Sequence, residues 1–153
     1  MTTTAIDVES KTLRIERDFQ APIERVFDAF TKPELAKEWW GPEGLAAPEI
    51  EFDLREGGAW RAVMQNDEGA QYTAAGVYEV IERPNRLVYT WGWVEDGVRG
   101  SETTVDIRLI QTEGGTRLTL VHGVFETVAD RDDHGEGWTS TLKSLDSFLS
   151  KPE

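Results

Sequence analysis

Between residues 48 and 125 apolar and polar residues alternate with a period of two, and this long run constrains the fold more than any other feature. Such alternation is typical of strands that bury one face. Connections that contain Gly, Asn or Asp, such as 66–69 and 113–115, separate the apolar runs. Because parallel strands need long crossovers, connections this short predict an antiparallel meander. The predicted strands cover 50–55, 59–65, 71–81, 86–94, 102–111 and 116–124.

The segment before the meander contains one further strand and two short helices. Residues 12–20 alternate like a half-buried strand. Pro22 then precedes apolar residues spaced i, i+3, i+4 and i+7, which predicts a helix up to residue 30. Pro33 begins a second short helix that Gly41-Pro42 ends, because proline cannot continue a helix.

The segment after the meander predicts one long helix. An acidic, glycine-containing stretch, 126–137, is expected to be a loop, and the helix is expected over 137–150. Only this helix is long enough to cover a face of the meander. The predicted fold class is therefore α+β, with a curved antiparallel sheet of about six to seven strands wrapped around the helix. Its apolar residues recur at helical spacing: Trp138, Leu142, Leu145 and Leu149.

Length and composition restrict the class of protein. The 153 residues suit one domain, expected over 11–150, with 1–10 as a flexible polar tail. The formal net charge of −13 argues against nucleic acid as a partner, because that binding needs Lys and Arg to neutralise phosphates. The absence of cysteine excludes disulfides and thiolate chemistry. With no membrane span and no secretory signal in view, we expect a cytoplasmic protein with no cofactor or metal.

Aromatic side chains gather where the predicted elements face one another. Indoles combine an apolar ring with a polar N–H, so they suit the wall of a pocket between sheet and helix. They also suit the filling of a wide core, and both interpretations remain open. The candidates are Tyr89, Trp91 and Trp93 on one face of one strand, Trp39 and Trp40 at the end of the second short helix, and Trp138 at the start of the last helix.

Polar side chains that point inward are the other candidates. Arg17 lies on the apolar face of its strand, where it would orient an anionic group of a ligand or pair with an internal acid. His122 lies on the inward face of the last strand, as a general acid or base or as a hydrogen-bonded core histidine. His134 lies beside Asp133, but one histidine among loop carboxylates matches no metal-ligand spacing.

Four motifs together resemble a known family. Residues 22–34 are similar to the segment after the first strand of the START-like, helix-grip (SRPBCC) superfamily. Residues 39–42, 57–61 and 84–90 resemble the branch named for homologues of the activator of heat-shock protein 90 ATPase. The resemblance covers about residues 11–150 and implies the helix-grip fold. Relatives bind lipids, sterols or aromatic polyketides, and a few cyclise or hydrolyse a bound ligand.

The sequence therefore favours a non-catalytic binding module for a small apolar or amphipathic molecule. The aromatic candidates would form the walls, with Arg17 and His122 as polar anchors. One alternative is a protein-interaction domain that contacts a chaperone or forms a homodimer, and another is a cyclase or hydrolase that uses His122. An open pocket lined by the rings would favour binding, a filled core would favour interaction, and an acid–base pair across a pocket would favour the enzyme.

Overall fold

The computed structural model describes residues 2–6, 11–41, 44–95, 98–100 and 102–151. Pro42 of the predicted helix end and two predicted turn residues, Asp96 and Gly97, lie outside the described residues. The described elements are β1 (Thr2–Ile6), β2 (Leu13–Phe19), α1 (Ile23–Thr31), α2 (Pro33–Ala36), β3 (Ala46–Phe52), β4 (Ala59–Gln65), β5 (Gln71–Glu82), β6 (Arg86–Glu95), β7 (Val98–Arg99), β8 (Thr103–Thr112), β9 (Gly115–Gly123) and α3 (Val128–Leu149).

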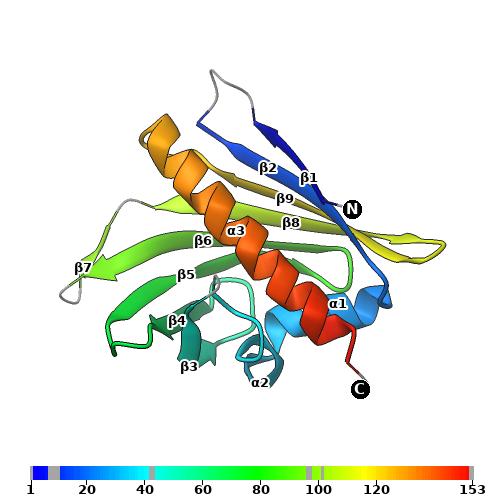
Figure 1. Cartoon of the computed structure of the whole chain (residues 1–153), viewed down its shortest axis with the longest axis horizontal. Helices are drawn as coiled ribbons and strands as arrows, with labels where there is room; N and C mark the ends of the chain where they lie inside the picture. The colour runs from blue at the N-terminus through cyan, green and yellow to red at the C-terminus, as the bar shows by residue number, and fades with distance from the viewer. Residues whose placement is uncertain (1, 7–10, 42–43, 96–97, 101, 152–153) are drawn as a thin grey trace.

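One antiparallel sheet contains all of these strands. Its order is β1-β2-β9-β8-β6-β5-β4-β3, and β7 pairs with β6. Neighbours in sequence are neighbours in the sheet from β3 to β6 and from β8 to β9, as expected for a meander. The sheet is curved, and α3 crosses one of its faces diagonally (Figure 1). The α+β fold class and the predicted arrangement of long helix, short helices and curved sheet are confirmed.

Two strands were not predicted. Thr2–Ile6 was expected to belong to a flexible tail, but it pairs with β2, from Thr2 opposite Arg17 to Ile6 opposite Leu13. Threonine favours extended backbone, and the added strand covers the hydrogen-bonding edge that β2 would otherwise expose. Residues 1 and 7–10 of the expected tail lie outside the described residues. The second unpredicted strand is β7, which pairs with the end of β6.

The last helix begins nine residues earlier than expected, at Val128, so most of the predicted acidic loop is helical. Thr127 caps it, because its Oγ1 accepts a hydrogen bond from the Asp130 N–H at 3.0 Å. The glycines of this stretch suggested a loop, since glycine weakens a helix interior. Gly135 is nevertheless buried, and a Cβ there would lie 3.2 Å from Leu13 Cδ1. The glycine therefore lets α3 approach β2 closely.

The inward face of the sheet consists of aligned rows of buried side chains. The pairings place Ile15 opposite Leu120, Leu120 opposite Ile107, and Ile107 opposite Leu87. Each of these four residues is at most 2% exposed. A slip of one residue in any strand would turn its side chains to the other face, so burial of the rows specifies the register. The buried residues of α3, including the four predicted from helical spacing, pack on this face.

The backbones of β5 and β6 approach each other closely at Gly76. The Trp60 Nε1–H donates to the carbonyl oxygen of Thr90 at 2.9 Å, across the backbone of Gly76. A Cβ at Gly76 would lie 1.8 Å from that oxygen. The pairing register also shifts between Tyr78 and Val80, which marks a β-bulge. Glycine next to a bulge is a common device for bending a sheet, because it permits close approach of two backbones.

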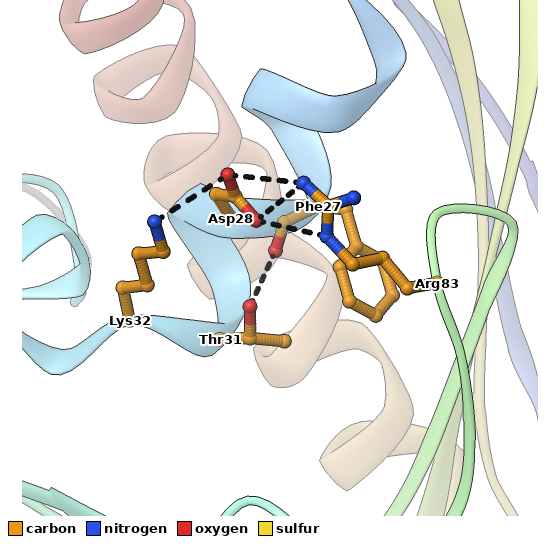
Figure 2. A network of polar contacts seen from close by, with 5 residues as sticks. All are labelled: Phe27, Asp28, Thr31, Lys32 and Arg83. Atoms are coloured by element: carbon orange, nitrogen blue, oxygen red, sulfur yellow. Dashed lines mark hydrogen bonds and ion pairs between the residues drawn. The ribbon is translucent and has the colours of Figure 1, made fainter.

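An ion-pair network holds α1 against the connection between β5 and β6 (Figure 2). The Arg83 guanidinium donates to both carboxylate oxygens of Asp28, at 3.2 and 3.3 Å, and Lys32 Nζ lies 3.7 Å from the same carboxylate. Arg25, also in α1, donates from Nη2 to the carbonyl oxygen of Lys151 at 2.9 Å, just beyond the end of α3. The helix α1 therefore links the sheet to the C-terminal end of α3.

Replacing Leu145 with Ala tests the packing of α3. Leu145 is fully buried against the sheet, so the loss of transfer free energy and the resulting cavity should lower the free energy of unfolding by about 2–5 kcal/mol. Urea denaturation of the purified variant measures this loss. Lys143→Ala in the same helix is the matched control, because Lys143 is exposed. A loss below about 0.5 kcal/mol for Leu145→Ala would contradict the packing.

Candidate functional site

A pocket of about 290 Å³ lies between the N-terminal half of α3 and the sheet, and we call it the inner pocket. Three groups of residues line it. Trp91 and Trp93 belong to β6, and Met64 belongs to β4. Trp40 and Gly41 follow α2, and α3 provides Asp130, Asp133, His134, Gly137, Trp138 and Thr141.

A wider hollow of about 780 Å³ adjoins the inner pocket, and we call it the outer hollow. Trp91, Trp93, Asp130 and His134 line both, so the two hollows are adjacent. The other lining residues of the outer hollow are Glu95, Gly100, Glu102, Thr103, Val124, Phe125 and Glu126.

Four indoles give the inner pocket its apolar walls. Trp91 and Trp93 are two residues apart and lie on the same face of β6. Their ring centroids are 4.4 Å apart, and the ring planes are nearly perpendicular. Trp93 is 40% exposed, whereas Trp40, Trp91 and Trp138 are each 8% exposed. The walls therefore become more accessible from Trp91 towards Trp93.

Two of the aromatic residues predicted as walls line neither hollow. Trp39 is buried against α1, where its Nε1–H donates to the Ala29 carbonyl oxygen at 3.1 Å and its ring lies 4.8 Å from Phe30. Tyr89 belongs to a filled aromatic cluster with Trp60 and Tyr78, around a void of only about 10 Å³. The Tyr89 hydroxyl is buried without a hydrogen-bond partner among the described residues.

Trp40 lies between the inner pocket and this filled cluster. Its ring lines the pocket, and it also lines the small void, with its centroid 5.8 Å from that of Trp60 and 6.2 Å from that of Phe52. The sequence left open whether the aromatic residues fill the core or line a pocket, and in the structure they do both. One group fills the core, another lines a pocket, and Trp40 separates the two.

A chain of hydrogen bonds through His122 joins the sheet to α3 behind the pocket. The Trp138 Nε1–H donates to His122 Nδ1 at 3.0 Å. His122 Nε2 lies 2.7 Å from Thr103 Oγ1, and the Thr103 hydroxyl donates to the Trp91 carbonyl oxygen at 3.1 Å. Because that hydroxyl uses its only hydrogen on the carbonyl, His122 must donate from Nε2 and accept at Nδ1.

His122 is therefore a neutral, fully hydrogen-bonded histidine. Burial lowers its pKa well below the ordinary value of a histidine, and the nearby His134 adds to this effect. The residue is completely buried and lines neither hollow. Taking up a proton at Nδ1 would break the bond from Trp138, so this geometry favours a core histidine over a general acid or base.

Arg17 lies away from the pocket, towards the C-terminal end of α3. Its Nη2 is 2.9 Å from Asp146 Oδ2, and its guanidinium lies 5.6 Å from the centre of the Phe19 ring. The side chain is 12% exposed. Of the two roles considered for Arg17, the structure contains the pairing with an acid, which joins β2 to α3.

His134 is one of the pocket residues that the sequence interpretation missed, as are Met64, Asp130 and Asp133. Its ring lies 4.9 Å from that of Trp91 and 4.7 Å from that of Phe125. Burial lowers its pKa, and the charges of Asp130 and Asp133 oppose that shift. Helical spacing could have identified it, since Asp130, His134 and Trp138 are four residues apart, but only if the helix had been extended to Val128.

The described part of the chain contains neither a candidate metal site nor a candidate membrane-spanning helix. No group of three or more His, Cys, Asp or Glu side chains there is arranged to hold a metal ion. No described helix combines the length and the apolar character that crossing a membrane requires.

A protein family matches most of the chain. The family described as Activator of Hsp90 ATPase homolog 1-like protein matches residues 20–150. A comparison with curated proteins gave no match.

Solved structures of several bacterial proteins are similar along nearly their whole length. The AHSA1 protein of Silicibacter pomeroyi is 35% identical, covers 91% of this chain and 97% of its own, and superposes with a TM-score of 0.82. A protein of Nitrosomonas europaea is 30% identical, with coverage of 94% and 96% and a TM-score of 0.79. A protein of Arthrobacter aurescens is 25% identical, with coverage of 98% and 92% and a TM-score of 0.88.

The neutral state of His122 predicts how stability depends on pH. Because its pKa is lowered in the folded protein, the unfolded chain takes up a proton first as the pH falls below about 6.5. Protonation of this one residue in the unfolded chain should then lower the free energy of unfolding by up to about 1.4 kcal/mol for each unit by which the pH is lowered. Urea denaturation at pH 7.5, 6.5 and 5.5 measures the slope.

The variant His122→Gln isolates this contribution, because glutamine keeps a donor and an acceptor but does not titrate. The free energy of unfolding of this variant should change less with pH over the same range than that of the unchanged protein. Part of the pH dependence that remains comes from His134, whose pKa is also lowered. Equal slopes in the two proteins would show that His122 is not held neutral by the fold.

Proposed function

The chain belongs to the family of Activator of Hsp90 ATPase homolog 1-like proteins, and we propose that it binds a small apolar or amphipathic molecule in the inner pocket. The observation that carries the proposal is the inner pocket beneath α3, which four indoles line. Specific sites for small molecules are typically concave and apolar with a few polar groups, and this site has that character.

The inner pocket limits the size and affinity of the ligand. Its volume of about 290 Å³ is at the lower end for drug-sized molecules. Burying about 200 Å² of apolar ligand surface contributes roughly 5 kcal/mol, at about 25 cal/mol for each Å². Association itself costs at least about 4 kcal/mol, so a small probe should bind weakly. A ligand that also extends into the outer hollow would gain further contact area.

The walls of the pocket are held in position before a ligand binds. Trp138 is tied to the sheet through His122, and the strand carrying Trp91 is part of the same hydrogen-bond chain. Rigid walls reduce the conformational entropy that is lost on binding. His122 has both ring nitrogens engaged, and no described hydrogen bond links His134 to a carboxylate. We therefore propose binding rather than a cyclase or hydrolase activity.

The alternative proposal is a protein-interaction domain, as the family description suggests. Exposed apolar side chains that line the outer hollow support it, namely Trp93 at 40% and Val124 at 69% exposure. Exposed apolar residues that lie together often mark protein interfaces. A chaperone partner or a second copy of the chain would then cover this region instead of a small molecule entering it.

Titration with small flat aromatic alcohols such as 2-naphthol tests the binding proposal. Tryptophan fluorescence should change with saturation, and ligand at a hundred times its dissociation constant should raise the free energy of unfolding by about 2.7 kcal/mol. Trp93→Leu should raise the dissociation constant by about five- to tenfold, because it removes one aromatic wall without breaking a described hydrogen bond.

Tyr89→Phe is the matched control, since Tyr89 lies in the filled cluster outside both hollows. Its dissociation constant should equal that of the unchanged protein. If no apolar probe changes fluorescence or stability, the binding proposal fails and the interaction alternative is favoured.

A further inference from the structure

The charged side chains among the described lining residues are all carboxylates. Asp130 and Asp133 line the inner pocket, and Glu95, Glu102 and Glu126 line the outer hollow with Asp130. No lysine or arginine is among the described residues that line either hollow. An apolar pocket with this rim repels a carboxylate or phosphate and attracts a cation.

The carboxylates that line the inner pocket differ from most aspartates in the rest of the structure. Asp18, Asp28, Asp106 and Asp146 each lie within 4.0 Å of an arginine. Neither Asp130 nor Asp133 has an ion-pair partner among the described residues. Their negative charges therefore remain available to a molecule in the pocket.

The basic residue between the two aspartates is paired with another carboxylate. Arg131 Nη2 lies 3.0 Å from a carboxylate oxygen of Asp132, which lines neither hollow. The helix dipole accounts for an acidic residue in the first turn of α3, where Asp130 lies. It does not account for Asp133, which lies in the second turn and also faces the pocket.

The walls of the pocket suit a cation as well. The face of an indole carries negative electrostatic potential, and tryptophan is the best aromatic partner of an organic cation. Trp40, Trp91, Trp93 and Trp138 surround the same space that the two aspartates line. His134 adds no repulsion at neutral pH, because burial lowers its pKa and keeps its ring uncharged.

We propose that the ligand is an organic cation, a quaternary or protonated amine attached to an apolar body. The apolar body lies among the indoles and Met64, and the cationic group lies beside Asp130 and Asp133. This inference rests on the proposed function, because it names the class of molecule that the inner pocket binds. It excludes fatty acids and other anionic amphipathic molecules as preferred ligands.

Three probes with one apolar body and different head groups test the proposal. They are trimethyl(4-phenylbutyl)ammonium, 4-phenylbutanol and 4-phenylbutyrate, titrated into the full chain by calorimetry or tryptophan fluorescence. The ammonium compound should bind about tenfold more tightly than the alcohol, and the carboxylate should bind most weakly. Raising the salt concentration from about 0.02 to about 0.5 M should weaken only the binding of the ammonium compound.

A double variant, Asp130→Asn with Asp133→Asn, should remove most of the preference for the ammonium compound over the alcohol. The matched control is Glu68→Gln with Glu136→Gln, which changes the net charge equally at exposed positions outside both hollows. That control should keep the preference. If the double variant does not fold, the single variant Asp133→Asn and the salt dependence of the unchanged protein provide the same test.

The outcomes separate the two proposals. If the ammonium compound and the alcohol bind the unchanged protein equally well, the pocket binds apolar molecules but the preference for a cation is refuted. A preference that persists in the double variant would also refute it, because the two aspartates would not be its cause. If none of the three probes binds, the proposed function itself fails.

Discussion

The position of α3 across the sheet determines both the core and the pocket. Polar contacts between distant parts of the chain help to hold it there, among them the ion pair of Arg17 with Asp146 and the hydrogen bond from Trp138 to His122. Towards its C-terminal end the helix is core, since Leu142 and Leu145 are fully buried. Its N-terminal half borders the pocket instead. One helix therefore stabilises the fold along part of its length and forms a wall along the rest.

The hydrogen bond to His122 is directional in a way that the packing of leucines is not. A buried indole N–H or imidazole nitrogen that loses its partner costs about 1–3 kcal/mol, so Trp138 has one strongly preferred orientation. The series of hydrogen bonds continues from His122 through Thr103 to the backbone of Trp91. The walls on both sides of the pocket are therefore connected through one neutral histidine. Burial favours the neutral form of this histidine, because no carboxylate among the described residues pairs with its ring.

Periodicity in the sequence predicted which residues share a face, but not how deep each of them lies. Tyr89, Trp91 and Trp93 do lie on one face of β6, yet their exposure rises from 3% to 8% to 40% along the strand. Depth depends on which other elements cover each position, and those elements come from distant parts of the chain. The helix start at Val128 was missed for a related reason. Gly135 weakens a helix locally, and only its contact with Leu13 explains why a glycine is favourable there.

Trp40 determines how far the pocket extends into the molecule. On one side its ring faces Trp91, Trp138 and the other pocket walls, and on the other it contacts the filled cluster around Trp60. Beyond it lie the small void and the unpaired hydroxyl of Tyr89. An apolar ligand gains by replacing water against the indoles, but it cannot reach this hydroxyl while the ring is in place. The proposed ligand therefore extends outward from Trp40, with its apolar end among the indoles and its cationic end beside Asp130 and Asp133.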